Sequence, residues 1–383
     1  MIGVKVQVKP LEIFLITGNT RIGGAQRILI DEYYELTRRG FKPQIISLTP
    51  RLANDDILNV DSHFQPSNEI SIHYIKGGKW KQVLILVSEF RLIRGKINIV
   101  SHDFTGVLIC RVAGILSFRR IKLALYIHQL MELSDPLQRQ KRIILSLLAS
   151  RIFVSSLQFQ KSWENYLKRS KFWRYLFQKS IFFDRMGVYL PRVLNSEVVK
   201  DKICGTNVRH VIFMSRMTAW KGFGEFRKFC RENSNPNLHS LILTTKSQNR
   251  ELFDESVDTD ENNHVIYESG VSNLAFPHGS VHLYPTNYGD GILYPQSIGM
   301  NVLELLAVGV PSVISPEGFL SWPELEYSIL IKTFDWQNTG ALEEVVSDLS
   351  LISRDHIRSE VERLLPVISI SSHVDCIIEY LLI

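Results

Sequence analysis

The chain has 383 residues, a length that favours two domains over a single hydrophobic core, and its composition is that of an ordinary globular protein. Its four cysteines lie far apart without a CxxC pair, which argues against a disulfide framework and a zinc site and favours a reducing compartment. The most apolar windows are short or interrupted by arginine, so we expect no membrane-spanning helix, and the start of the chain does not resemble a signal peptide.

The net charge of +5 is divided unevenly along the chain. Residues 1–200 contain 31 Lys and Arg against 15 Asp and Glu, whereas residues 201–383 contain 13 against 24. A surplus of cations indicates that the first half meets an anionic partner, such as a membrane surface or a phosphorylated substrate. The second half is acidic, so its few cations stand out.

The first half alternates short apolar segments with amphipathic ones. We expect strands at 11–18, 43–49, 97–103, 122–128 and 151–156. A helix is expected at 23–40, because Gly40 ends an amphipathic pattern whose last turn contains two arginines. Apolar strands that alternate with helices predict a parallel sheet covered by helices on both faces.

The same alternation begins again after residue 205. Strands are expected at 209–215, 239–245, 264–270, 280–286 and 311–315. The predicted fold class is therefore α/β with two domains, which we assign to residues 1–197 and 198–365. The last segment, 366–383, is apolar enough to need a partner surface, and we expect this helix to pack back on the first domain.

The segment GNTRIGG at 18–24 joins an expected strand to an expected helix. The free N–H groups and positive dipole end of that helix favour a phosphate or carboxylate near Gly23 and Gly24. The spacing is not GxGxxG, and no acidic residue ends the next strand to hold a ribose, which argues against a nicotinamide-dependent oxidoreductase. The alternative is that these glycines only let the helix pack closely.

Two cations follow the first expected strand of the second half. Arg216 and Lys221 lie in SRMTAWKG at 215–222, where Gly222 permits a tight turn. Both could bind one anionic group, because Arg makes bidentate contacts with phosphate oxygens and Lys supplies a point charge. The alternative is a pair of solvated surface cations.

Glu304 is the one charged residue in an otherwise apolar helix that Gly309 and Pro311 bring to an end. An unpaired buried carboxylate costs several kcal/mol, so this residue needs a partner. A capping box, with Asn301 as N-cap and Glu304 as the N3 residue, would supply one.

Taken together, these features resemble the retaining glycosyltransferases of the GT-B fold, in family four of their classification. The resemblance extends from residue 11 to about 320 and rests on GGAQR at 23–27, the pair Arg216 and Lys221, QSIG at 296–299, Glu304, and GVPSVIS at 309–315. It implies two Rossmann-like domains whose parallel sheets face a central cleft. It also implies a nucleotide-sugar donor, bound mainly to the second domain, with no cofactor beyond that co-substrate.

The resemblance further implies roles for single residues. Arg216 and Lys221 would neutralise the diphosphate of the leaving group. His128, at the end of an expected strand, would face the donor sugar from the first domain and hydrogen-bond a hydroxyl or guide the acceptor proton. These three are the candidate catalytic residues. The candidate sugar-nucleotide-binding residues are Gly23, Gly24, Gln296, Ser297, Ile298, Gly299, Met300 and Glu304, of which Glu304 would accept the ribose hydroxyls and the stretch 297–300 would offer backbone N–H groups.

Three features depart from the family pattern. Gln296 stands where the family has the first of two acids eight positions apart, and an amide can hydrogen-bond a hydroxyl but carries no charge. Ser215 replaces a glycine, and the loop from Thr286 to Pro295 is long. Gln296 leaves open a non-catalytic protein that binds sugar nucleotides or polysaccharides.

Two further segments carry binding signals. Residues 161–179 combine six Lys and Arg with aromatic residues, which is typical of a helix on an anionic bilayer; the alternative is an ordinary surface helix whose aromatics pack inward. No nucleic-acid-binding module accompanies this segment, so we expect no nucleic-acid partner. The DTD at 258–260 lies in a polar acidic loop, which predicts a solvated turn and no metal site.

The sequence thus predicts a cytoplasmic hexosyltransferase, peripheral at the inner membrane face. It would transfer a sugar without a metal to a lipid-linked or polysaccharide acceptor in bacterial surface glycan synthesis, and the resemblance alone implies that it does so with retention. Closure of the two domains would exclude water from the reaction.

Overall fold

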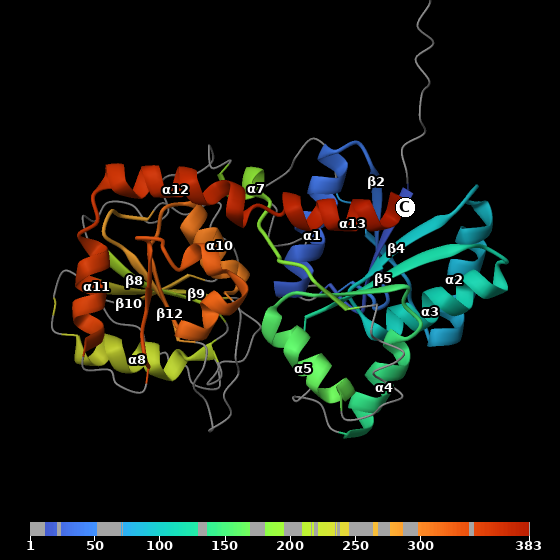
Figure 1. Cartoon of the computed structure of the whole chain (residues 1–383), viewed down its shortest axis with the longest axis horizontal. Helices are drawn as coiled ribbons and strands as arrows, with labels where there is room; N and C mark the ends of the chain where they lie inside the picture. The colour runs from blue at the N-terminus through green and yellow to red at the C-terminus, as the bar shows by residue number, and fades with distance from the viewer. Residues whose placement is uncertain are drawn as a thin grey trace, which may run out of the picture.

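The computed structural model consists of two α/β domains that lie side by side (Figure 1). It describes residues 12–20, 24–51, 70, 72–128, 136–168, 181–194, 209–215, 217, 221–233, 235, 238–244, 263–266, 276–285, 298–336 and 341–382. Every strand pairing within the two sheets is parallel. The predicted fold class is therefore confirmed.

The first domain is built on a seven-stranded sheet with the order β3-β2-β1-β4-β5-β6-β7. Its strands are β1 (Glu12–Thr17), β2 (Lys42–Ser47), β3 (Ile72–Tyr74), β4 (Ile97–Ser101), β5 (Ile121–Ile127), β6 (Arg151–Val154) and β7 (Ile181–Phe183). The five strands expected in this half are all present. The two that were not predicted, β3 and β7, are three-residue edge strands that are only partly buried.

Helices cover both faces of this sheet, because alternate residues of each strand point to opposite sides. Phe14 and Ile16 of β1 share a core with α2 (Lys79–Leu92), α3 (Phe104–Leu116) and α5 (Leu157–Lys168). Ile13 and Leu15 pack on the other face against α1 (Gly24–Arg38) and the C-terminal helix α13 (Ser371–Leu382). The helices α4 (Pro136–Ser146) and α7 (Leu190–Leu194) complete the described helices of this half.

The second domain has a six-stranded sheet with the order β10-β9-β8-β11-β12-β13. Its strands are β8 (Arg209–Met214), β9 (Leu238–Leu243), β10 (Asn263–Ile266), β11 (Val281–Tyr284), β12 (Ser312–Ile314) and β13 (Ile331–Thr333). The five strands expected in this half are present, and β13 is a short edge strand that the sequence did not indicate.

The helical segments of the second domain also lie on both faces of its sheet. They are α8 (Phe223–Glu232), α10 (Met300–Ala307), η3 (Pro316–Ser321), η4 (Pro323–Leu325), α11 (Leu342–Ser350) and α12 (Arg354–Ile368). Helices α8 and α11 pack on one face, whereas α10 and α12 pack on the other. The predicted capping box at the start of α10 is wrong, because Gly299 is the N-cap and the Asn301 amide instead donates to the Met214 carbonyl oxygen at 2.6 Å.

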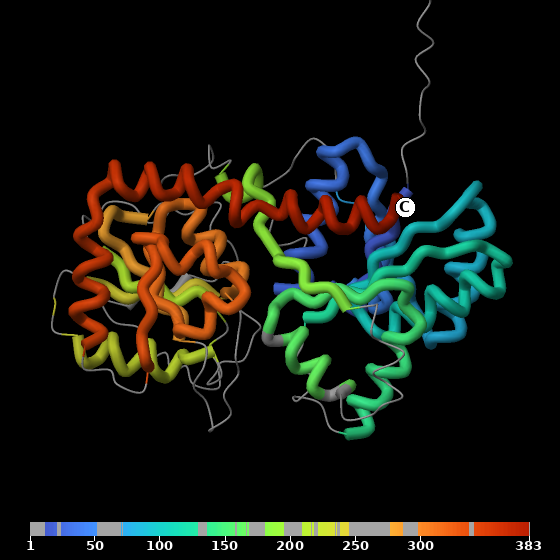
Figure 2. Tube along the Cα trace, viewed as in Figure 1, coloured from blue at the N-terminus to red at the C-terminus, as the bar shows by residue number. Residues whose placement is uncertain are grey.

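The C-terminal segment returns to the first domain (Figure 2). After α12, the chain runs beside the segment that follows β7, where Ile370 N–H donates to Val188 O at 2.9 Å and Val188 N–H donates to Ile368 O at 2.8 Å. Helix α13 then packs against α1, and its buried Val374 and Ile377 belong to the core of the first domain. A helix from the end of the chain therefore completes a domain built from its beginning.

The predicted membrane segment at 161–179 is only partly described, because α5 ends at Lys168 and residues 169–179 lie outside the described residues. Trp163 is fully buried and stacks on Phe104 with ring centroids 6.1 Å apart, and Leu167 is also buried. Trp163 therefore packs inward and cannot lie at the level of lipid headgroups. Among the described helices, none is long and apolar enough to cross a bilayer.

Candidate active site

Three segments of the second domain meet where β8 and β11 end. Lys221 lies just before α8, and its Nζ is 5.9 Å from the ring centroid of Tyr284, the last residue of β11. The Tyr284 hydroxyl lies so close to Gly299 that a Cβ built there would be 2.5 Å away. The ammonium group, the phenol and the start of α10 therefore belong to one site at the carboxyl edge of the sheet.

Gly222 allows the loop after β8 to approach the end of β11. Its φ is +73°, and a Cβ at this position would lie 2.0 Å from the Pro285 carbonyl oxygen. Both observations require glycine, because other residues rarely adopt this conformation and a side chain would collide with the backbone. The close approach brings the neighbouring Lys221 to Tyr284.

The first turn of α10 faces the same place. Its N-cap residue is Gly299, which has no side chain to cap the helix, so the helix start offers backbone N–H groups and the positive end of its dipole to an anion. The structure thus brings together the predicted residues Lys221, Gly299 and Met300, with the buried Ile298 directly before them. The other predictions in this region, Arg216, Gln296 and Ser297, lie outside the described residues, as does Gly23 of the first domain.

Glu304 is completely buried and is held by two arginines. Its Oε1 accepts from Arg192 Nη2 and its Oε2 from Arg27 Nη1, both at 2.8 Å. Arg27 lies in the first turn of α1, three residues after Gly24, so this ion pair joins the two domains. The resemblance implied that ligand hydroxyls satisfy this carboxylate, whereas in the structure arginines do so. The contact of Glu304 with a ribose stays a prediction. For a ribose hydroxyl to reach the carboxylate, Arg27, whose side chain is 10% exposed, would have to release the Oε2 atom of Glu304.

Arg192, on α7, also pairs with an acid of α1. It donates to both carboxylate oxygens of Asp31 on α1, at 2.7 and 3.0 Å, and its side chain is fully buried. Asp31 also accepts from the backbone N–H of Tyr189 at 3.1 Å. Two acids and two arginines thus form one buried cluster, in which each charge has an opposite partner.

His128 lies at the carboxyl end of β5 and is half-buried. Its Nε2 is 3.0 Å from Nδ1 of His102, which follows β4, and the two rings stack 5.2 Å apart. Burial, and then the neighbouring His102, hold the pKa of His128 well below its usual range. The ring is therefore neutral at pH 7 and suited to hydrogen-bond a hydroxyl. The sequence placed His128 at a strand end, but its role toward a sugar stays a prediction.

A cavity of about 500 Å³ lies elsewhere in the second domain. It is bordered by residues 276–280, 307–311 and part of α12, at the opposite end of β11 from Lys221. The converging groups, and not this cavity, mark the candidate site. Within the described ranges no group of His, Cys, Asp and Glu is arranged to hold a metal ion, and the DTD at 258–260 lies outside them.

Comparison with known proteins shows the fold. No family model matches the sequence, and no curated protein does. A glycosyltransferase from Rickettsia africae ESF-5 superimposes with a TM-score of 0.66 at 12% identity, over 98% of this chain and 99% of that one. Anabaena Alr3699/HepE in complex with UDP-glucose gives a TM-score of 0.65 at 12% identity, over 96% and 98%. This chain has the GT-B fold.

A third structure agrees with that assignment. The lipopolysaccharide outer core galactosyltransferase WaaB, in its apo form, matches with a TM-score of 0.57 at 11% identity, over 96% of this chain and 99% of that one. These matches each cover at least 96% of the chain. At these identities the likeness shows the fold, while family four and retention stay predictions.

Sequence reasoning missed several groups that line this part of the GT-B fold. Arg27 is the last residue of the GGAQR segment. Its place in the first turn of a helix that follows a glycine loop could have indicated that it lies at the site. His102 ends an expected strand next to the strand of His128, so it could have been found in the same way. No local signal identifies Arg192, because its place depends on partners 112 and 161 residues away.

Proposed function

We propose that this protein transfers a sugar from a nucleotide-diphosphate donor to a saccharide or lipid-linked acceptor, as a member of the retaining family four. The observation that supports this most is the meeting of Lys221, Tyr284 and the start of α10 at one edge of the second sheet. The chain shares its fold with Anabaena HepE, whose structure contains UDP-glucose.

In this proposal the diphosphate of the sugar donor lies at the start of α10. The N–H groups around Met300 bind its oxygens, and the Lys221 ammonium, together with Arg216, neutralises the charge that develops as the glycosidic bond breaks. These groups supply the positive charge without a metal. Ser297 adds a backbone N–H group for the diphosphate, and Gln296 hydrogen-bonds a hydroxyl of the sugar nucleotide. The sugar nucleotide is a co-substrate, and no further cofactor takes part.

We assign retention to a displacement on one face of the sugar. The acceptor oxygen forms its bond to the anomeric carbon while the bond to the diphosphate breaks, and the departing phosphate oxygen takes the acceptor proton. His128 contacts a hydroxyl of the sugar donor or of the acceptor from the first domain. Closure of the domains excludes water, which would otherwise hydrolyse the sugar donor.

A thermal-shift panel of UDP-, GDP-, TDP- and ADP-sugars tests this function. One class of nucleotide should raise the melting temperature, because a ligand at 100 times its dissociation constant stabilises the folded state by about 2.7 kcal/mol. Incubation with membrane extract should then release the nucleoside diphosphate. Stabilisation without release would identify a non-catalytic binding protein, and the absence of any shift would contradict both functions.

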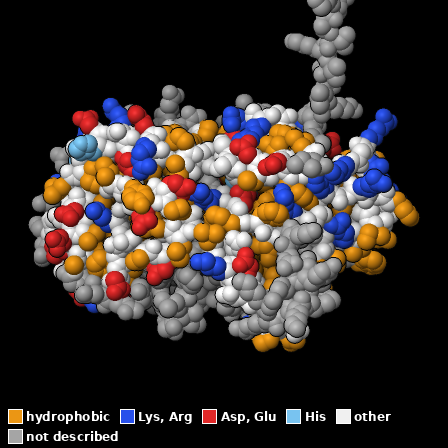
Figure 3. All heavy atoms as spheres, in the orientation of Figure 1, with side chains coloured by type: hydrophobic (Ala, Val, Ile, Leu, Met, Phe, Trp, Pro, Cys, Tyr) orange, Lys and Arg blue, Asp and Glu red, His pale blue; other side chains and the backbone are white. Residues whose placement is uncertain are grey.

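We further propose that the protein works in the cytoplasm on a bacterial surface glycan, with the first domain against an anionic membrane. Helix α2 exposes three large apolar residues at intervals of four and eight positions, Trp80, Leu84 and Leu92. In the turn after α3, the side chain of Phe118 is 92% exposed. The Arg91 guanidinium links the two helix ends through Leu116 O. Lysines and arginines gather over this end of the molecule (Figure 3). Apolar groups surrounded by cations fit a bilayer interface.

Removing the apolar groups should weaken binding to vesicles that contain phosphatidylglycerol. We expect Leu92→Ser combined with Phe118→Ser to lower the partition coefficient at least tenfold in co-sedimentation, since burying each side chain is worth about 1.5–3 kcal/mol. Tyr327→Ser, which changes an 85% exposed residue of the second domain, is the matched control. Equal binding of the double variant and the control would refute this surface.

A further inference from the structure

A chain of polar contacts connects His128 with the C-terminal helix. His102 joins His128 at 3.0 Å and the Glu32 carboxylate at 2.9 Å. The other oxygen of Glu32 contacts His373 Nε2 at 2.6 Å, and His373 Nδ1 contacts Asp184 at 2.6 Å. The side chains of Glu32 and His373 are fully buried and that of His102 is 2% exposed, so His128 is the end that reaches the surface.

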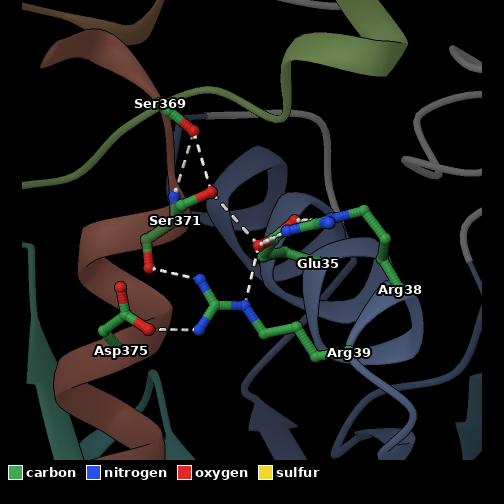
Figure 4. A network of polar contacts seen from close by, with 6 residues as sticks. All are labelled: Glu35, Arg38, Arg39, Ser369, Ser371 and Asp375. Carbon is green, nitrogen blue, oxygen red and sulfur yellow. Dashed lines mark hydrogen bonds and ion pairs between the residues drawn. The ribbon is translucent and has the colours of Figure 1, made fainter. Parts of the chain in front are cut away.

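The start of α13 is fixed to α1 by a second set of contacts, shown in Figure 4. Arg39 donates to the Ser371 carbonyl oxygen at 2.8 Å and pairs with Asp375, while the Ser371 hydroxyl donates to Glu35 at 3.1 Å. Glu35 also accepts from Arg39 at 2.8 Å. On α13 these contacts flank His373. On α1 they begin at Glu35, one turn beyond Glu32, so they hold the Glu32 and His373 side chains in contact.

The charges of the buried members follow from their partners. Burial alone would raise the pKa of Glu32, but its bonds to His102 and His373 outweigh burial and lower the pKa to about 2. Burial alone would lower the pKa of His373, but Asp184 and Glu32 raise it to about 10. At pH 7 Glu32 is a carboxylate, and His373 is an imidazolium that donates from both ring nitrogens to two acids.

These charges determine where the ring protons of the other two histidines lie. A carboxylate only accepts, so His102 must donate to Glu32 from Nε2. A neutral His102 that donates from Nε2 has an acceptor at Nδ1. His128 must then donate from Nε2, which leaves the lone pair of this neutral ring on Nδ1.

We propose that Glu32, held by His373 of the C-terminal helix, acts through His102 as a positioning residue that fixes His128 in one tautomer. In this tautomer Nε2 carries the proton and Nδ1 accepts a hydrogen bond from a substrate hydroxyl. The contact with substrate rests on the proposed function, whereas the tautomer does not. The last helix of the chain thus contributes to the site of the first domain.

Nitrogen-15 NMR of the histidine-labelled full chain tests the tautomer without any turnover. At pH 7.5 we expect His128, assigned with His128→Gln, to show a protonated Nε2 and an unprotonated Nδ1. His102→Phe keeps a ring in the stack but removes both nitrogens. The Nε2 proton of His128 then loses its acceptor, so its NMR signal should be lost through exchange with solvent. His73→Phe, which removes a half-exposed histidine paired with Glu89, should leave the His128 signals unchanged. A proton on Nδ1 of His128 in the wild type, or an unchanged Nε2 proton in His102→Phe, would overturn the proposal.

Two further variants test the role of His373 and the contact with substrate separately. In His373→Gln the Glu32 carboxylate loses the imidazolium that holds its other oxygen, so its bond to His102 should loosen and the Nε2 proton of His128 should exchange with solvent faster. An unchanged pattern would overturn the role of His373. Once a sugar donor is identified, His102→Phe should lower kcat at least tenfold with an unchanged Kd for the nucleotide. If the tautomer is found but no sugar nucleotide is turned over, the proposed function fails and the positioning of His128 stands.

Discussion

Replacing Lys221 with alanine should lower kcat by about two to three orders of magnitude, as the loss of one preorganised electrostatic contact to a transition state does. The ammonium lies beside Tyr284 and the start of α10, where negative charge would appear on the departing diphosphate. The contact strengthens as the bond breaks, so kcat should fall more than the affinity for the sugar nucleotide. Steady-state kinetics on the variant, with release of nucleoside diphosphate as the signal, measures both.

Lys228→Ala is the matched control for that experiment. Lys228 is on α8, seven residues further along, with a side chain that is 55% exposed and 4.0 Å from Glu232. Its loss should leave kcat and the melting temperature within error of the wild type, because an exposed ion pair contributes little. If Lys221→Ala and Lys228→Ala had the same turnover, Lys221 would not act on the leaving group.

The carboxyl ends of most strands could be predicted from the sequence, and these ends indicate where a site would lie. Strands that alternate with helices imply a parallel sheet, and the loops after such strands meet at one edge. This reasoning placed Lys221 after a strand of the second sheet and His128 at the carboxyl edge of the first, whereas the resemblance implied that Lys221 and the start of α10 bind one diphosphate. The strands it missed, such as β3, have three residues and half-buried side chains, too few for an alternation to be recognised.

The partners of the buried charges could not be predicted. In the sequence, Arg27, Asp31 and Glu32 belong to the polar positions of an amphipathic helix, which normally face water. In the structure all three are buried, because side chains of α10, α7 and α13 pair with them in turn. The carboxylate of Glu32 meets a histidine 341 positions away, and no local pattern encodes such a contact. The helix was predictable, but its environment depends on the complete fold.

Glu304→Leu should destabilise the protein by about 3–5 kcal/mol, the usual cost of breaking a buried ion pair by removing one partner. Arg192 would lose one of its two acids while remaining fully buried, and the guanidinium of Arg27 would face an apolar side chain. The free energy of unfolding, measured in urea, should reveal this loss. Glu232→Leu, which removes an exposed partner of Lys228, should cost less than about 1 kcal/mol.

Arg27→Met in the same assay separates the two arginines. Because Arg27 is 10% exposed, while Glu304 keeps its bond to the fully buried Arg192, this variant should lose less stability than Glu304→Leu. Adding Arg27→Met to Glu304→Leu should restore part of the lost stability, since the second change removes a charge that the first left unpaired. If the two losses simply added, Arg27 and Glu304 would not be coupled, and the ion pair would not be what joins α1 to α10 at the site.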